Sequence, residues 1–569
     1  MENLLLNQPN KKIILLGNEA IVRGALESGV QFVSTYPGTP ASEIGNIFFK
    51  LSQNNEFKGY FEFSTNEKVA LEAGIGASFS GLKTMVAMKN FGLNVCLDTL
   101  LPFLYTGTKG PTVIIVADDP SCHSSAQSEE NSRGFAQLAH IPILEPSDPQ
   151  ECKDFVKLAF QISEKFKIPV MIRTTTRVAH QRMPVKLAKI NNQHRVLVKG
   201  KFIKEPKRFV TLPPRVLEMK KELLEKIKKI QQFSEKSKIN KAAIGQEQFL
   251  TKSKMGIITS GISYLYVMEA LKELHLKLPV LKLGFFYPLP EEKIKSFIKN
   301  FKKVLIIEEL EPYLEKEIER LAKNINPKLQ IFGKDLIPEV GELKPEIVTL
   351  AIAKVTNSKF HPAPKTWGGA KQIPNSKFQI PKRYPQLCHG CPYWLVVSAV
   401  KKAVNEKEVI FGGEIGCYML FGNSPVNLQD YLSCMGSSVG IAHGIKKALR
   451  LVSGQAAAQK LISFVGDSSF FHAGIPALIN TVFNKSNPLI IILENQTTAM
   501  TGHQPHPGAP ATPNGIKIEE IVKACGVKNL KVIDPAHQEE FIQTIKEFIN
   551  KEDVSVIIAT HPCVFVAKK

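Results

Sequence analysis

The segment from Phe464 to Asn495 constrains the fold of this chain more than any other part of its sequence. It reads FVGDSSFFHAGIPALINTVFNKSNPLIIILEN, in which two apolar runs flank a helix-like segment, and this predicts a β–α–β unit in a parallel sheet. Asp467 follows the first run and Asn495 follows the second. Because ligands bind at the carboxyl ends of parallel strands, we expect both side chains at one edge of the sheet. Mg²⁺ takes few protein ligands and completes its shell with water and phosphate oxygens, and Gly466 would let a diphosphate approach the backbone.

This pattern resembles the thiamine diphosphate fingerprint, in which G-D-G is followed, after a helix and a strand, by Asn. The third position departs from it, because Ser468 stands where the pattern has Gly. The resemblance implies that Asp467 and Asn495 hold Mg²⁺ and that Gly466 and Ser468 contact the cofactor. An ordinary β–α–β unit with a glycine turn is the alternative interpretation.

The length and composition indicate a large globular protein. At 569 residues the chain exceeds one core, and a prior of ~150 residues per domain suggests three or four domains. No apolar run reaches the ~18 residues of a membrane span and the start lacks the order of a signal peptide, so we expect a cytoplasmic protein without a membrane partner. The nine cysteines of so long a chain do not suggest a disulfide framework, so we expect them to be reduced, buried or metal-bound.

The formal net charge of +21 raises the question of an acidic partner. The lysines are spread widely and are densest between Lys199 and Lys241, around the amphipathic run LEMKKELLEKIKKI. No base-reading motif accompanies them, so we expect no nucleic-acid partner. A solvated helix face is the plainer interpretation, and attraction of acidic partners is the alternative.

Apolar runs alternate with helical periodicity almost throughout, which predicts an α/β fold with mainly parallel sheets. In the first block, five runs are expected to be strands that deliver their loops to one edge of a sheet: KKIILLGN, QFVSTYPGTP, TMVAMKNFG, PTVIIVADDP and IPVMIRTTT. We predict three domains, at 11–190, 255–355 and 386–569, with a Lys-rich connector at 191–254 and a Pro- and Lys-rich linker at 356–385.

An enzyme that uses thiamine diphosphate needs one buried Glu facing the pyrimidine ring, because this carboxyl group activates the cofactor's own aminopyrimidine as the base. The segment STNEKVALEAGIGASFSG places Glu67 at the start of a helix rich in small residues. Taken alone, this Glu would be read as a helix N-terminal acid favoured by the dipole.

Long motifs extend the likeness over nearly the whole chain: YPGTPASEI, TNEKVALEAGIGAS, MKNFGLNV, ADDPSCHSSAQSEENSR, EIGCYML, CMGSSVGIAHG, GDSSFFHAGIPALIN and TTAMTGHQPHPG. Together they resemble the alpha subunits of indolepyruvate ferredoxin oxidoreductases, within the thiamine-dependent 2-oxoacid:ferredoxin oxidoreductases. The resemblance implies a pyrimidine-type, a transketolase C-terminal-like and a diphosphate-type domain, with the cofactor between the first and last. It also implies that an aryl pyruvate is cleaved to CO₂, that two electrons pass to ferredoxin, that the acyl group passes to CoA, and that a separate beta subunit completes a hetero-oligomer.

Several further site residues are implied by this likeness. Glu67 is the expected pyrimidine activator. Thr39, in the loop from Tyr36 to Pro40, is a candidate donor to the substrate carboxylate, although a plain turn role is as good an interpretation. Arg133 is a candidate partner of the same carboxylate, with a surface salt bridge as the alternative. The remaining implied residues are a proton shuttle at His503 or His506, for which a structural role is equally open, and cofactor contacts at Gly416, Gly436 and Thr497.

The electron path depends on cysteine positions. The family's alpha subunit usually ends in a ferredoxin-like domain with two C-x2-C-x2-C-x3-C-P runs, and this sequence contains none, so we do not expect that relay here. The order Cys388, Cys391, Cys417 and Cys563 resembles the proximal [4Fe–4S] site of related cofactor-binding subunits. One C-x2-C pair alone fits zinc or turn thiols equally well, and LCHGCPYW departs from the usual CPGCPH.

Two rival functions remain open from the sequence. A non-oxidative thiamine-dependent 2-oxoacid decarboxylase or carboligase would use the same cofactor without iron. A basic scaffold or nucleic-acid-binding protein that has lost catalysis would bind unrelated DNA in a salt-dependent way.

Overall fold

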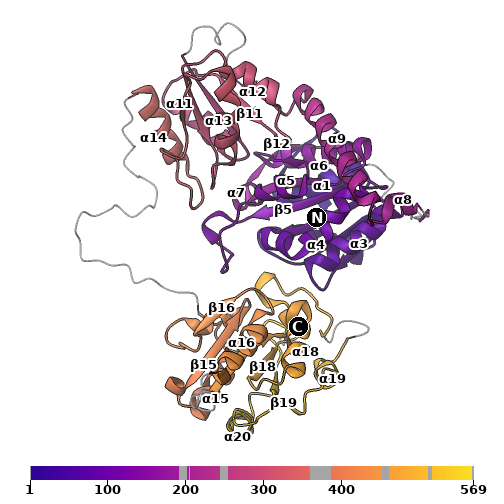
Figure 1. The fold of residues 1–569 in the computed structure, drawn as a ribbon, viewed down its shortest axis with the longest axis vertical. Helices are drawn as coiled ribbons and strands as arrows, with labels where there is room; N and C mark the ends of the chain where they lie inside the picture. Colours follow the sequence, from indigo (N-terminus) through magenta and orange to yellow (C-terminus); the bar gives the residue numbers. More distant parts are fainter. Residues whose placement is uncertain are drawn as a thin grey trace. The chain divides into compact units, whose positions relative to one another are not determined.

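The computed structural model describes residues 2–190, 202–203, 205–243, 254–358, 386–451, 460–509 and 515–566. It divides into two compact units, Met1–Lys371 and Gln372–Lys569 (Figure 1). The predicted linker at 356–385 lies outside the described residues from 359 onward. The predicted connector at 191–254 lies outside them at 191–201, 204 and 244–253, and its described part contains the amphipathic helix α9 (Arg215–Lys236).

The first unit is built on a sheet of seven strands. Its order is β12 (Phe285–Tyr287), β6 (Ile143–Leu144), β7 (Val170–Thr175), β5 (Thr112–Asp118), β4 (Thr84–Lys89), β2 (Phe32–Thr35) and β3 (Tyr60–Phe63). All neighbours are parallel except β12, which runs antiparallel to β6. The central strands β4, β5 and β7 are buried along their whole length, as expected for strands covered on both faces.

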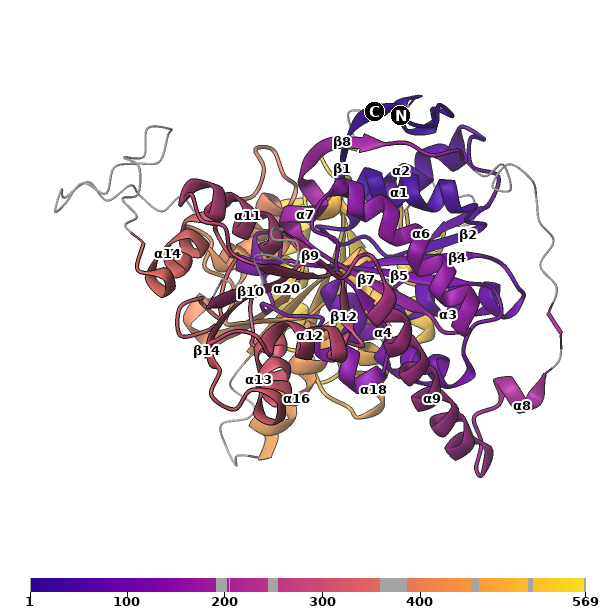
Figure 2. The ribbon, with the colours of Figure 1, turned by 90° about the horizontal axis from the view of Figure 1, so that it is seen from above.

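Helices follow the strands in an alternating order. They are α1 (Gly17–Ser28), α2 (Ser42–Gln53), α3 (Glu67–Phe79), α4 (Asn90–Thr106), α5 (Gly134–Ala139), α6 (Pro149–Phe166), α7 (Thr176–His180) and α8 (Pro206–Phe209). Helices α1 and α6 lie side by side (Figure 2). Helices α3 and α4 pack against each other and against β4. Because α3 follows β3 and α4 follows β4, both helices start at the carboxyl edge of the sheet.

One of the five predicted strands does not belong to this edge. The run KKIILLGN forms β1 (Lys12–Leu16), which pairs antiparallel with β8 (Arg182–Lys186) in a separate two-stranded ribbon. The prediction was wrong for this run because only part of it is buried, and Ile14 stays 69% exposed. The other four runs contain β2, β4, β5 and β7, as predicted.

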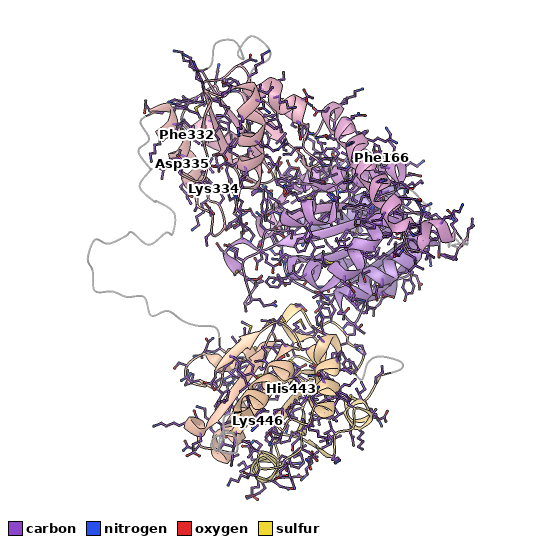
Figure 3. All side chains as sticks on the ribbon, viewed as in Figure 1. Phe166, Phe332, Lys334, Asp335, His443 and Lys446 are labelled. Carbon is purple, nitrogen blue, oxygen red and sulfur yellow. The ribbon has the colours of Figure 1, made fainter. Side chains whose placement is uncertain are left out.

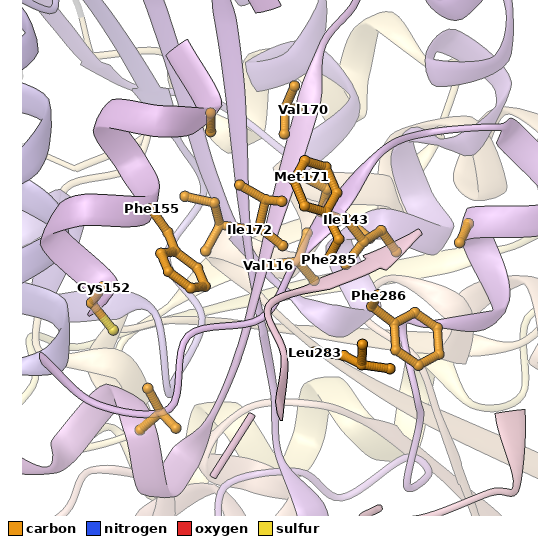
Figure 4. Packing of buried hydrophobic residues seen from close by; sticks show 14 of the residues in the cluster. Val116, Ile143, Cys152, Phe155, Val170, Met171, Ile172, Leu283, Phe285 and Phe286 are labelled. Atoms are coloured by element: carbon orange, nitrogen blue, oxygen red, sulfur yellow. The ribbon is translucent and has the colours of Figure 1, made fainter. Parts of the chain in front are cut away.

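A five-stranded sheet completes the first unit. Its order is β14 (Gln330–Phe332), β13 (Lys303–Ile307), β10 (Met255–Ser260), β11 (Val280–Leu283) and β9 (Lys241–Ala243), and its helices are α11 (Ser263–Glu273), α12 (Glu291–Ile298), α13 (Tyr313–Ile325) and α14 (Pro345–Thr356). After β11 the chain crosses over and adds β12 to the seven-stranded sheet. Leu283 and Phe285 therefore pack with Ile143 and Ile172 in one hydrophobic core shared by both sheets (Figure 4).

The second unit has one parallel sheet of six strands. Its order is β16 (Tyr431–Ser433), β15 (Val409–Glu414), β17 (Lys460–Gly466), β18 (Leu489–Glu494), β20 (Ser555–Thr560) and β19 (Asn529–Ile533). Its helices are α15 (Tyr393–Ala403), α16 (Ser437–Leu451), α17 (Asp467–Ser469), α18 (Ile475–Phe483), α19 (Ile518–Ala524) and α20 (Gln538–Phe548). His443 of α16, labelled in Figure 3, joins this helix to the loop before β18, because its Nδ1 lies 2.9 Å from Ser486 Oγ.

The prediction of an α/β fold with mainly parallel sheets is confirmed. Within the described ranges, no helix is both long and apolar enough to cross a bilayer.

Candidate functional site

Asp467 and Asn495 lie at neighbouring strand ends in the second unit. Gly466, the last residue of β17, pairs with Leu493 of β18, so the next residues of both strands emerge at the same edge. Oδ2 of Asp467 accepts the backbone N–H groups of Asn495 at 3.0 Å and Gln496 at 2.9 Å. The loop after β18 therefore packs on the Asp467 carboxylate, and its two N–H groups hold this carboxylate in one orientation.

The side chain of Asn495 is also held in one orientation. Its Nδ2 donates to the hydroxyl of Tyr393 at 2.7 Å, and its Oδ1 accepts the N–H of Thr497 at 3.1 Å. An amide oxygen keeps a second lone pair when it accepts one hydrogen bond, so Oδ1 retains the capacity to bind a cation. The contact of Tyr393 with Asn495 was not predicted, because the sequence showed only that Tyr393 departs from the usual cysteine motif.

His506 is the histidine that lies beside this carboxylate. Its Nδ1 accepts the N–H of Gly508 at 3.2 Å, which puts the proton of the neutral ring on Nε2. Nε2 lies 3.1 Å from Asp467 Oδ2 without the alignment of a hydrogen bond. His503 is exposed instead, and its ring lies 5.7 Å from that of Phe565.

A hard-oxygen site for one Mg²⁺ fits these residues. An Asp and an Asn project from adjacent strand ends, and Mg²⁺ requires only a few protein ligands because it keeps waters and phosphate oxygens. Among the described residues, no group of three or more His, Cys, Asp or Glu side chains is arranged to hold a metal ion by itself. A site with two protein ligands takes the rest of its shell from water and from the phosphate oxygens of a ligand.

The glycines at this edge are required by close contacts. Gly436 has a φ of +79°, and a Cβ there would lie 2.7 Å from the carbonyl carbon of Ala473, so no other residue fits without a shift. A Cβ on Gly466 would lie 2.8 Å from the ring of Tyr418, and a Cβ on Gly416 would lie 2.3 Å from the same ring. Tyr418 thus fills the space beside both glycines.

Tyr418 belongs to a buried polar pair that the sequence reasoning missed. Its hydroxyl accepts the N–H of Gly466 at 2.8 Å and donates to Glu414, the last residue of β15. Glu414 also accepts the N–H of Gly436. Burial raises the pKa of Glu414 to about 8, because its surroundings disfavour the charged form. The motif EIGCYML held both residues, but nothing in its linear pattern showed that they are buried against Gly466.

Glu67 occupies the carboxyl edge of the seven-stranded sheet in the first unit. Asn66 caps α3 by accepting the N–H of Val69 at 2.9 Å, and Glu67 is the first helical residue, 7% exposed. A Cβ on Gly92, in the first turn of α4, would lie 2.4 Å from Glu67 Cγ. The glycine of MKNFGLNV therefore allows the Glu67 carboxyl to lie against the start of α4.

The loop that carries Thr39 follows β2 at the same edge. It contains a cis Thr39–Pro40 bond, and Asn18 fastens it by donating to the Pro40 carbonyl at 2.7 Å. Thr39 is partly buried, and its Oγ1 lies 3.4 Å from Ser42 Oγ. Thr39 follows β2 and Glu67 follows β3, and these paired strands place both residues at the same edge of the sheet.

Arg133 reaches from the seven-stranded sheet toward the five-stranded one, and the prediction that it pairs with a substrate carboxylate is corrected by its contacts. The guanidinium binds Glu145 through Nε and Nη2, both at 2.7 Å, and Glu308 through Nη1 at 3.0 Å. Nη2 also donates to Ser260 Oγ at 2.8 Å, and Nη1 to the Glu309 carbonyl at 3.4 Å. All five N–H groups are committed, and at 2% exposure Arg133 is not a surface salt bridge either.

The four predicted cluster cysteines lie near enough in the second unit for their thiols to influence one another's pKa. Burial, with a smaller contribution from the other thiols of the set, Cys388 and Cys563 among them, raises the pKa of Cys391 to about 11 and that of Cys417 to about 12. The backbone N–H of Cys563 donates to the Asn495 carbonyl at 3.1 Å. These thiols are thus electrostatically coupled beside Asn495, although they do not converge on a single-ion site.

Comparison with known proteins assigns both units. The family model "Pyruvate flavodoxin/ferredoxin oxidoreductase, thiamine diP-bdg" matches residues 23–243, and "Thiamine pyrophosphate enzyme, C-terminal TPP binding domain" matches residues 414–559. Indolepyruvate oxidoreductase subunit IorA of Methanothermobacter thermautotrophicus is 41% identical over 99% of this chain and 88% of its own length. The protein of the same name from Archaeoglobus fulgidus is 37% identical over 99% of this chain and 88% of its own.

A solved structure is more distantly similar. It is the 2-oxoglutarate:ferredoxin oxidoreductase from Magnetococcus marinus with 2-oxoglutarate, coenzyme A and succinyl-CoA bound. The two sequences are 18% identical, and the match covers 60% of this chain and 65% of that chain with a TM-score of 0.49.

Proposed function

The chain belongs to the indolepyruvate oxidoreductase IorA family of thiamine-dependent 2-oxoacid oxidoreductases, and on this premise we propose that it catalyses the oxidative decarboxylation of a 2-oxoacid with CoA. Aryl pyruvates such as indolepyruvate are the first candidates, and the products are acyl-CoA, CO₂ and two electrons for ferredoxin. The observation that carries the proposal is the match of thiamine-binding family models to both units. A non-oxidative decarboxylase is not favoured, because relatives that match 99% of this chain are named oxidoreductase subunits.

In this proposal Asp467 and Asn495 hold Mg²⁺ and, through it, the diphosphate of the cofactor. Asp467 is already oriented by two backbone N–H groups and Asn495 by Tyr393, so neither side chain has to reorganise. The other proposed diphosphate contacts at the same edge are Gly416, Gly436, Gly466, Ser468 and Thr497. When bound, thiamine diphosphate supplies the electron sink that decarboxylation of a 2-oxoacid needs.

Glu67 is proposed to hold a proton at the pyrimidine ring nitrogen. Its burial supports this role, because a carboxyl group shielded from water gives a stronger hydrogen bond. Thr39 is proposed to donate its hydroxyl to the substrate. The proton shuttle proposed for His503 or His506 is better supported for His506, since this ring is buried beside Asp467 while His503 is exposed.

Cys388, Cys391, Cys417 and Cys563 are proposed to bind a [4Fe–4S] cluster. A cubane is larger than one ion, so its four thiolates stand farther apart than the ligands of Zn²⁺. Thiols that influence one another's pKa without converging on a single-ion site fit the larger group. Bound there, it would supply one-electron chemistry beside Asn495, which Cys563 contacts through its backbone.

The proposal includes a companion subunit in a hetero-oligomer, with ferredoxin as the electron acceptor. The name of the relatives, a subunit, supports the first point. The nine cysteines form no disulfide among the described residues, which fits a reducing cytoplasm.

Anoxic assay of the chain expressed with its companion subunit tests the proposal. A panel of 2-oxoacids should drive viologen reduction that depends on CoA and thiamine diphosphate, with aryl pyruvates the best substrates. Decarboxylation to an aldehyde without viologen reduction would favour the non-oxidative alternative, and no 2-oxoacid-dependent reaction would reject both.

A further inference from the structure

Lys89 is a buried cation at the carboxyl edge of the first unit. It is the last residue of β4 and only 9% exposed. Its Nζ donates to the carbonyl of Ser124 at 2.8 Å and lies 4.9 Å from the centre of the Phe91 ring. Among the described residues, no carboxylate oxygen lies within ion-pair distance of this ammonium group, and the nearest acids act on it from farther away.

A buried charge without a counter-ion is costly, and proteins normally pair it. Burial lowers the pKa of Lys89 to about 8 even though Asp119, Cys122, Glu130 and Glu67 oppose the shift. The acid with the largest opposing effect, Asp119, has its own donors, since it accepts hydrogen bonds from Ser124, Ser125 and Thr176 at 2.6–2.7 Å. The ammonium group of Lys89 therefore has the capacity to bind an anion that the chain itself does not provide.

The position of Lys89 links it to the residues already assigned to the reaction. A Cβ on Gly38 would lie 2.8 Å from Lys89 Cβ, so the loop that carries Thr39 packs directly on this lysine. Lys89 also precedes the first turn of α4, against which the Glu67 carboxyl lies. The next residue, Asn90, is 1% exposed and its Oδ1 has no hydrogen-bond partner in the structure, a second polar group at this strand end that awaits one.

We propose that Lys89 binds the carboxylate of the 2-oxoacid substrate, the role that sequence reasoning had given to Arg133. The inference rests on the proposed function and deepens it. A 2-oxoacid carries one obligatory carboxylate next to the reacting carbonyl, and the site must hold this anion close to Glu67 and Thr39. Lys89 is the cation that the fold places between them.

The test compares Lys89→Met with Lys83→Met in the assembled complex. Lys83 is a matched control, because it also donates to one backbone carbonyl, that of Ser28 at 2.8 Å, and also lies over a ring, that of Phe160, at 5.6 Å. It stands just before β4, at the opposite end of the strand. In Lys89→Met the KM for the 2-oxoacid should rise about 10- to 100-fold, as expected for loss of a charged hydrogen bond. In Lys83→Met it should stay at the wild-type value.

Two further readouts separate substrate binding from a structural role. Inhibition by the uncharged methyl ester of the substrate should be unchanged in Lys89→Met, and Lys89→Arg should recover part of the loss. In the wild type, the KM should rise about tenfold per pH unit above about 8, as the Lys89 ammonium loses its proton.

The possible outcomes are distinct. Equal KM values in Lys89→Met and Lys83→Met would overturn the inference, as would equal weakening of the ester and the acid. If Lys89→Met does not fold, an unchanged KM for the 2-oxoacid in Lys89→Gln overturns it. A wild-type complex without any 2-oxoacid-dependent viologen reduction points to failure of the proposed function instead.

Discussion

Replacing Arg133 by Met should destabilise the first unit and leave substrate binding unchanged. The side chain joins the two sheets of this unit, because Glu145 follows β6 of one sheet and Glu308 follows β13 of the other. Met fills a similar volume but leaves both carboxylates without their main partner. Of its two cationic partners Glu145 would keep Arg173, whose Nη1 lies 3.3 Å away.

The size of the effect follows from the burial of the charges. All three side chains are 1% exposed, and removing one partner of a buried ion pair costs about 3–5 kcal/mol, because the remaining charge is left uncompensated. Burial alone would raise the pKa of Glu145, but the charges of Arg133 and Arg173 hold it at about 2. A lowered carboxyl pKa contributes stability above the unfolded value of ~4.3 that is lost as the pH falls. The difference between variant and wild type should therefore be largest at neutral pH and shrink between about pH 4 and pH 2.

Urea unfolding followed by circular dichroism measures this difference, with Arg177→Met as the control. Arg177 makes a similar two-point pair with Glu342, at 2.8 and 2.9 Å, but its side chain is 54% exposed, so its loss should cost no more than about 1 kcal/mol. Equal stabilities of the two variants would refute the reasoning. A raised KM for the 2-oxoacid in a stable Arg133→Met variant would restore the original assignment of Arg133 to the substrate.

Three further substitutions test the proposed site. Glu67→Gln should abolish 2-oxoacid-dependent viologen reduction while thiamine diphosphate stays bound, whereas Glu72→Gln, on the exposed side of the same helix, should leave turnover near normal; the reverse pattern removes Glu67 from its role. Asp467→Ala should weaken the binding of Mg²⁺ and of thiamine diphosphate together, by at least tenfold in Kd for loss of a charged ligand, and an unchanged affinity would move the metal site elsewhere. Cys563→Ser should deplete iron and acid-labile sulfide relative to Cys525→Ser, and equal iron contents would reject Cys563 as a ligand.

The strand ends of both units were predictable because glycines and polar residues follow the apolar runs in the sequence. Gly466 and Asp467 follow the apolar run of one strand, and Glu494 and Asn495 follow that of the next. Parallel strands bring such residues to one edge of the sheet. The helix that starts at Glu67 was predictable for the same reason, since Asn66 is a good N-cap and small residues follow.

The burial of Lys89 and Arg133 was not predictable from the sequence. Whether a lysine or an arginine is buried depends on what packs over it, and Lys89 is covered by the Gly38 loop and by Phe91, which the sequence does not bring together. Arg133 was misassigned because two of its partners, Ser260 and Glu308, are distant in the sequence and reach it only through the second sheet. The crossing of β12 into the first sheet was hidden for the same reason, since nothing in FFY distinguishes one sheet from the other.

Calorimetric titration of thiamine diphosphate into the assembled complex tests the central claim most directly. The account predicts saturable binding that requires Mg²⁺, is weakened by Asp467→Ala and persists in Glu67→Gln. An assembled, folded complex that takes up no thiamine diphosphate in the presence of Mg²⁺ would contradict it.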